Sequence, residues 1–122
     1  MFSFQKLNVY ADSKELVALV YQLLRKYPNI EQYALCDQLR RAVISVPSNI
    51  AEGMSRISCK EQIHFLEISF GSLMEVLCQM EISKDLNYIT LEDYIAIQNL
   101  IEKISKQLSG LRKSLLVKIE RA

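Results

Sequence analysis

The sequence has few of the residues that interrupt helices or carry common active-site chemistry. Among 122 residues there are three glycines, two prolines, three cysteines and one histidine. Scarce glycine and proline argue against a disordered or linker-rich chain and favour a helical one. Cys36, Cys59 and Cys78 are odd in number and include no Cys-x-x-Cys pair. We therefore predict reduced thiols packed as small apolar groups, in a protein of the cytoplasm.

Other absences exclude further locations and functions. No apolar run approaches the roughly 20 residues of a membrane span, and the N-terminus lacks the pattern of a secretory signal. We therefore expect no membrane partner. The net charge of +1 implies no general attraction to nucleic acid. Gly53, Gly71 and Gly110 each stand alone, so the chain has no glycine loop to cradle a phosphate.

Catalytic chemistry has little support. His64 is the only histidine, and a metal site or proton relay built on histidine usually needs further ligands or partners. Because His64 lies beside an apolar seam, we predict that it is a partly buried structural residue. Glu52 and Glu75 form either a pair of catalytic carboxylates or a hydrogen-bonded tie between two helices, through Asn49 and Ser72. We favour the tie, and predict no enzyme activity, no metal and no cofactor.

What the sequence does have is apolar residues at helical spacing. Half of its residues are hydrophobic and 24% are charged. Capping residues, Pro28 and Gly53 divide the chain into four helical segments, and the short joints make consecutive helices antiparallel neighbours. The segments are residues 8–27, 31–54, 59–86 and 90–119. The sequence thus predicts one domain, residues 1–122, that is an all-α, up-down-up-down antiparallel four-helix bundle.

The expected helix starts depend on capping signals. The first helix begins either with Asn8 as its cap or with a capping box that starts at Asp12. Another capping box starts at Ser58 and predicts the beginning of the third helix. Thr90 is the expected cap of the fourth helix.

The third and fourth segments carry heptad stripes, which favour helices packed at a shallow angle. The stripes are Ile63, Leu66, Phe70, Leu73, Leu77 and Met80, and then Tyr94, Ile97, Ile101, Ile104, Leu108, Leu111 and Leu115. Additional apolar residues lie off the main apolar faces: Phe65, Ile68 and Val76 in the third segment, Ile44 and Ala51 in the second. This surplus either marks an interface between copies or is the wide apolar arc of a small bundle.

Pro47 interrupts the second helix. The apolar arc of that helix is Leu35, Leu39, Ala42, Val46 and Ile50. A proline inside a helix removes a backbone hydrogen bond, frees the carbonyl of Val43 and predicts a bend. Ser45, Ser48 and Asn49 are placed to satisfy polar groups near that bend. The segment is either a kinked helix satisfied by its own side chains or a kink that shapes a subunit contact or ligand site.

The stretch around this proline, RRAVISVPSNIAEGMSR, resembles the signature of the 23S ribosomal RNA intervening-sequence proteins, a family of four-helix bundles. Its matching residues are Arg41, Ser45, Val46, Pro47, Asn49, Ile50, Ala51, Glu52, Gly53 and Arg56. In a second block, FLEISFGSLMEV, they are Phe65, Leu66, Gly71, Ser72, Leu73 and Glu75. The chain departs from the family at Ser69, where alanine is common, and lacks a second glutamate in this block. The resemblance covers nearly the whole chain.

Membership in this family implies a fold but no particular activity, because most members of the family have no assigned activity. The family is similar to the accessory variability proteins of diversity-generating retroelements. Those proteins form homopentameric barrels and bind a reverse transcriptase and RNA. The resemblance therefore implies self-association, as a pentamer by this comparison, and makes RNA or a protein the partners to consider.

Basic residues gather at the end of the fourth helix. From Glu102 onward there are six lysines or arginines and two glutamates. In an up-down bundle this end lies near the turn between the second and third helices. The candidate basic end is Arg56, Lys60, Arg112, Lys113, Lys118 and Arg121. It is either a patch for RNA phosphates or a solvated helix end whose cations the helix dipole favours.

Two hypotheses about function follow. In the first, the protein is a non-enzymatic homo-oligomer that binds RNA or a ribonucleoprotein through its basic end. In the second, it is a purely structural or protein-interaction module with no nucleic-acid binding. The sequence shows no aromatic residues interleaved with the basic ones for stacking on bases, which weakens the first hypothesis.

Overall fold

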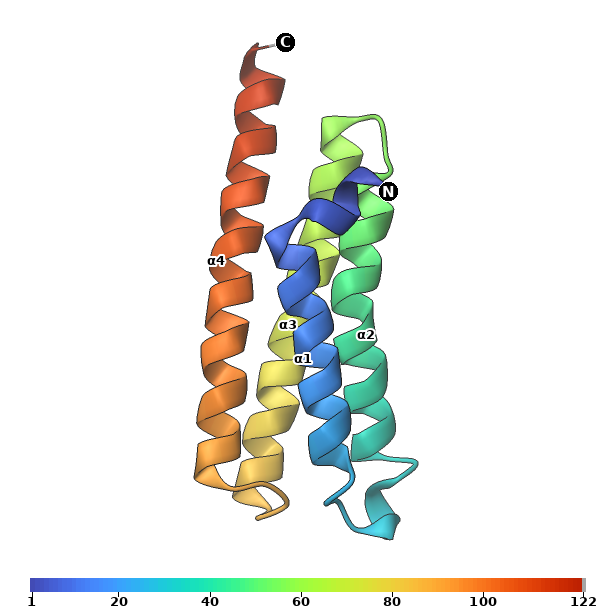
Figure 1. The fold of residues 1–122 in the computed structure, drawn as a ribbon, viewed down its shortest axis with the longest axis vertical. Helices are drawn as coiled ribbons and strands as arrows, with labels where there is room; N and C mark the ends of the chain where they lie inside the picture. Colours follow the sequence, from blue (N-terminus) through green and yellow to red (C-terminus); the bar gives the residue numbers. More distant parts are fainter. Residues whose placement is uncertain (122) are drawn as a thin grey trace.

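Four long helices make up the chain in the computed structural model, which describes residues 1–121 and leaves Ala122 of the predicted domain outside the described residues. They are α1 (Asn8–Leu24), α2 (Leu35–Met54), α3 (Cys59–Asp85) and α4 (Leu91–Arg121), with short 3-10 turns η1 (Ser3–Lys6) and η2 (Asn29–Glu31). Residues 1–121 contain no strand. Successive helices run in opposite directions along the bundle: down, up, down and up in the view of Figure 1. Each packs against the next in sequence, and α1 closes the ring against α4. The predicted all-α four-helix bundle is confirmed.

The helix starts differ from the predicted ones at two places. Helix α1 begins at Asn8 with Leu7 as its cap, so neither Asn8 nor Asp12 caps it. Asp12 lies inside the helix, and its carboxylate accepts a hydrogen bond from Gln107 of α4 at 2.8 Å. Helix α2 begins at Leu35 instead of residue 31. The chain after Pro28 first forms the turn η2, because the proline holds its own backbone extended.

The capping residues predicted for α3 and α4 are confirmed, but at α3 only the bond to the Ser58 hydroxyl forms and not the reciprocal half of the predicted capping box. The hydroxyl of Ser58 accepts a hydrogen bond from the backbone N–H of Glu61 at the start of α3. At the start of α4, Thr90 Oγ1 accepts from the N–H of Asp93 at 3.0 Å, and Asp93 accepts from the N–H of Thr90 at 3.1 Å. These side chains satisfy backbone donors that the first turn of a helix leaves without partners.

The predicted apolar seam is confirmed on α4, and on α3 it is confirmed at Ile63, Leu66, Leu73 and Met80 but not at Phe70. Every seam residue of α4 is buried except Leu111, which is half-buried. On α3, Phe70 is 40% exposed, and Val76, which we expected to lie off the seam, is fully buried. The buried face of α3 also carries Ser69, Ser72 and Ser83. The heptad pattern misplaced this face because α3 packs against α2 through small serines as well as against α4 through larger residues.

Of the predictions made for single residues, some are confirmed by the structure and others are wrong. Cys36 is buried as predicted, and burial raises the pKa of its thiol, but Cys59 is half-buried and Cys78 is exposed. His64 is exposed with its ring against Phe65, so the prediction of a partly buried histidine is wrong. Helix α2 continues through Pro47, and the bend there stays a prediction. No helix within residues 1–121 is long and apolar enough to cross a bilayer.

Candidate nucleic-acid interface

The signature residues of α2 and α3 form a polar link between the two helices. The Ser45 and Ser72 hydroxyls lie 2.8 Å apart, and Asn49 donates to both the carbonyl and the hydroxyl oxygen of Ser45 at 2.8 Å. Ser69, fully buried, donates to the carbonyl of Val46 at 2.9 Å. Asn49 and Ser45 thus satisfy polar groups beside Pro47, as the structural interpretation of this segment predicts.

The two glutamates that we expected in this link are not part of it. Glu52 is exposed and pairs with Arg56, in the turn that follows α2, at 2.5 Å. Glu75 is exposed and borders a shallow hollow beside Arg41. Helix register explains the separation, because Glu52 and Glu75 lie at levels of the bundle about ten residues, roughly 15 Å, apart. The predicted carboxylate tie is therefore wrong, although Asn49 and Ser72 do take part in the link.

Gly53 brings α2 and α3 close together at their shared turn. A Cβ atom at this position would lie 2.7 Å from Cβ of Phe65, nearer than packed atoms allow. The close approach leaves the Phe65 ring beneath Arg56, whose guanidinium carbon lies 4.9 Å from the ring centre. Gln62 holds the same corner by donating to the Arg56 carbonyl at 2.9 Å. An arginine and an aromatic ring are thus fixed together at one end of the bundle.

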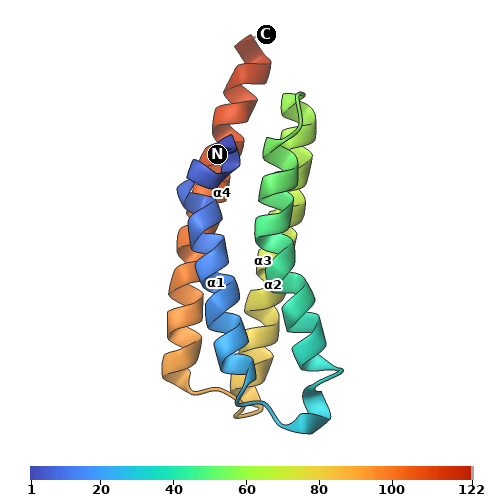
Figure 2. The same ribbon diagram turned by 45° about the vertical axis from the view of Figure 1, so that its right-hand side comes forward.

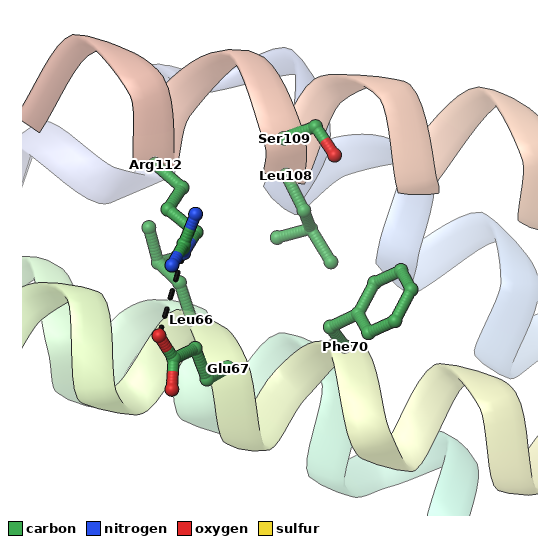
Figure 3. A pocket seen from close by; sticks show the side chains of 6 residues that line it. All are labelled: Leu66, Glu67, Phe70, Leu108, Ser109 and Arg112. Atoms are coloured by element: carbon green, nitrogen blue, oxygen red, sulfur yellow. Dashed lines mark hydrogen bonds and ion pairs between the residues drawn. The ribbon is translucent and has the colours of Figure 1, made fainter. Parts of the chain in front are cut away.

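A second arginine and a second aromatic ring line one pocket between α3 and α4. The pocket encloses about 280 Å³ and is lined by Leu66, Glu67, Phe70, Leu108, Ser109 and Arg112. Figure 3 shows Arg112 reaching from α4 toward Glu67, with the Phe70 ring farther along the same opening. Arg112 Nε lies 3.4 Å from a carboxylate oxygen of Glu67, and both side chains are about half exposed. The pocket therefore offers a guanidinium, a hydroxyl and part of an aromatic face to a ligand.

The structure places all six candidate basic residues on the surface at one end of the molecule. The α2–α3 turn and the end of α4 share that end, and α4 extends beyond the turn (Figure 1 and Figure 2). Arg56 and Lys60 lie at the turn, whereas the other four residues, Arg112, Lys113, Lys118 and Arg121, follow α4. Helices α2 and α4 occupy diagonal positions and do not contact each other. The predicted basic end is therefore two groups of charges with α3 between them.

Three lysines of the basic end form no ion pair with another described residue. Lys60, Lys113 and Lys118 have no carboxylate of residues 1–121 within ion-pair distance. At the opposite end, Lys26 lies 2.9 Å from Asp93, and this bond holds the pKa of Asp93 below its usual range. Cations without a carboxylate partner are available to an external anion such as a phosphate.

Phe65 and Phe70 are functional candidates that the sequence pattern did not identify. Phe70 was assigned to the apolar seam, and its neighbour Arg112 lies 42 positions later in the chain. Only the antiparallel register of α3 and α4 brings the two together. Their one sequence signal is that both phenylalanines belong to the second signature block.

Three comparisons relate the chain to known proteins. The family model described as 23S rRNA-intervening sequence protein matches residues 5–110. A crystal structure from Bacteroides thetaiotaomicron, described as a protein with unknown function from the S23 ribosomal protein family, has a TM-score of 0.79 and 26% sequence identity. That similarity covers 86% of this chain and 98% of the other. A comparison with curated proteins finds no match.

The matched region contains both signature blocks and the α2–α3 turn, and it ends at Gly110, before the four basic residues of α4. The α2–α3 link therefore lies within the matched region, while the basic end of α4 lies outside it. Because the match spans most of the chain and the fold agrees with it, the chain belongs to the 23S rRNA-intervening sequence protein family.

Proposed function

We propose that this protein is a non-enzymatic, cytoplasmic homo-oligomer that binds RNA or a ribonucleoprotein through its basic end. The observation that carries the proposal is the pairing of arginine with an aromatic ring at two places on that end. Arg56 lies over Phe65, and Arg112 shares a pocket with Phe70. Proteins bind single-stranded nucleic acids by this combination, because cations contact phosphates and rings stack on bases.

The ion pair of Arg112 does not prevent such binding. Its partner Glu67 is 55% exposed, and an exposed pair at 3.4 Å contributes only about 0–1 kcal/mol. The guanidinium has five N–H donors, and a phosphate accepts bidentate hydrogen bonds from them. A phosphate that takes the place of the Glu67 carboxylate beside Arg112 therefore gives up only the small free energy of that ion pair.

Self-association supplies the affinity that one basic end lacks. Each chain is close to neutral, with a net charge of +1, so a single end attracts RNA weakly. Copies held in one assembly raise the effective concentration of each end near a bound strand. By their resemblance to the accessory variability proteins, we propose a pentamer.

A second candidate function is a protein-interaction module without RNA binding. The outward side of α3 favours it, because Ile68 and Ile82 are 39% and 43% exposed there. The two functions share the oligomer and differ in what the basic end does.

Fluorescence anisotropy with labelled single-stranded and hairpin RNA tests the proposal. We expect binding at low salt that weakens steeply as salt rises, since phosphate neutralisation releases counterions. The double substitution Arg112→Glu with Lys113→Glu should abolish binding and leave the oligomer intact. The matched control, Arg41→Glu with Lys84→Glu, changes the net charge equally but away from this end, and should retain most of the affinity.

Two single substitutions probe the pocket itself. Phe70→Leu keeps an apolar side chain but removes the ring, and should weaken single-stranded RNA binding by about tenfold, the loss of one stacked base. Glu67→Gln releases Arg112 and should strengthen binding severalfold. The RNA proposal is wrong if wild-type protein binds neither RNA at low salt, or if the double reversal binds as well as the wild type. Either result favours the protein-interaction module.

A further inference from the structure

Helix α3 carries a second heptad stripe, on the side that faces away from the bundle. Its positions, alternately four and three residues apart, are His64, Ile68, Gly71, Glu75, Cys78 and Ile82. All of them are exposed. Two of them, Ile68 and Ile82, are large apolar side chains, and no helix within residues 1–121 packs over this side of α3.

Gly71 lies in the middle of this stripe. A Cβ atom at Gly71 would meet nothing within 4 Å, so no contact within the chain requires a glycine there. A glycine inside a helix costs about 1 kcal/mol relative to alanine. Without a side chain, however, the backbone of a neighbouring helix can approach closely. Gly110 has equally open surroundings, but its helical neighbours are Lys106, Lys113 and Ser114, which do not form an apolar face.

A groove between α1 and α2 has a complementary shape and charge. Its apolar part encloses about 500 Å³ and is lined by Tyr10, Lys14, Val17, Ala18, Ile44, Pro47, Ser48 and Ala51. A second hollow along the same two helices includes Arg25 and Arg40. All the charged residues that line the two hollows, Lys14, Arg25 and Arg40, are basic. In contrast, the outward stripe of α3 carries Glu75 and borders Glu81, and no lysine or arginine lies between Lys60 and Lys84.

From this complementarity we infer that the outward stripe of α3 docks into the α1–α2 groove of a second copy of the chain. Ile68, Gly71 and Ile82 pack on the apolar lining, and Glu75 and Glu81 lie against the basic residues of the groove. The two surfaces differ, so the contact is heterologous, and each subunit offers one of each. Such contacts close into a ring when the rotation between subunits allows it. This inference rests on the proposed self-association and names the surfaces that make it.

Two variants, each damaged on one surface, test the inference. Gly71→Leu places a bulky side chain in the α3 stripe, where the subunit itself has room for it. Ala18→Arg fills the groove with a long charged side chain at an exposed position. Each variant alone should have the mass of a single chain by size-exclusion chromatography with light scattering. Gly110→Leu, the matched glycine control, should keep the wild-type mass, and thermal melting followed by circular dichroism should show that all three variants fold.

Mixing the two variants distinguishes this contact from a symmetric one. Gly71→Leu keeps an intact groove, and Ala18→Arg keeps an intact stripe, so the mixture should form a complex of one chain of each and nothing larger. If the wild type is an oligomer and Gly71→Leu has the same mass, the inference is wrong and the proposed self-association stands. If both variants dissociate but do not combine, the heterologous contact is wrong. A monomeric wild type overturns self-association and this inference together, without bearing on RNA binding by the basic end.

Discussion

The two interfaces of α3, with α2 and with α4, are built from different chemistry. Against α2, α3 presents buried serines that hydrogen bond across the interface, and Gly53 lets the two backbones approach closely. Against α4, it presents larger apolar residues, and a pocket of about 280 Å³ remains beside Arg112. The signature residues of the family are concentrated in the first interface. The difference indicates that the α2–α3 pair fixes the scaffold, while the end of α4 is less constrained.

The same contrast predicts where substitutions disturb the fold. Changing a residue of the α2–α3 link disturbs a buried hydrogen bond or a close backbone approach. Changing a basic residue at the end of α4 alters only an exposed side chain beyond the matched region. Substitutions in the two interfaces should therefore differ in their effect on stability.

The largest effect is expected at Gly53. Gly53→Ala should lower the free energy of unfolding by about 1–2 kcal/mol, because its Cβ would overlap Phe65 and overpacking outweighs the gain in helix propensity. Gly71→Ala and Gly110→Ala, with open space around each Cβ, should each raise it by up to about 1 kcal/mol. Urea denaturation of the three variants measures this. A Gly53→Ala protein as stable as the other two would show that α2 and α3 are not tightly packed at their turn.

A smaller effect is expected for the hydroxyl pair of Ser45 and Ser72. A double-mutant cycle with alanine at each position should give a coupling energy of about 1 kcal/mol, the usual net value of one hydrogen bond. The matched cycle for Glu67 and Arg112 should give less than about 0.5 kcal/mol, since that pair is exposed. Equal coupling in the two cycles would contradict the contrast between the interfaces.

The smallest effect concerns pH. Asp93 bonds Lys26 between α4 and α1, and its pKa is lowered mainly by that bond. A lowered carboxyl pKa stabilises the fold above the unfolded pKa of about 4, and this contribution is lost as the pH falls through the folded pKa. Asp93→Asn should therefore lower the free energy of unfolding by less than about 1 kcal/mol near pH 7, because Lys26 is half exposed. Measured by denaturation at several pH values, the difference from wild type should shrink as the pH falls below about 4 and vanish below the folded pKa of Asp93.

The α2–α3 link supplies the control for this pH dependence. Ser45, Ser72 and Asn49 do not titrate in this range, so Ser72→Ala should cost the same at pH 3.5 and pH 7. A pH-dependent cost for Ser72→Ala would mean that an ionisable group acts on the link.

Much of the fold was predictable because helices are specified locally. Capping at Ser58 and Thr90 acts within three residues, and the seam of α4 follows from a period that is visible in a short window. The α3 seam was not predictable in the same way. Two apolar stripes compete on that helix, and the choice between Phe70 and Val76 for the core depends on which helices pack on either side.

The candidate site was predictable only in part, for a related reason. The sequence alone determined four antiparallel helices, the polar residues around Pro47 and the collection of basic residues at one end, since these follow from local patterns and short joints. Only the tertiary structure decided that Gly53 meets Phe65, that Phe70 lies beside Arg112 and that Gly71 faces outward. Those pairings depend on the register between helices, which is set by how side chains far apart in the sequence pack together, and a pattern within one helix carries no information about it.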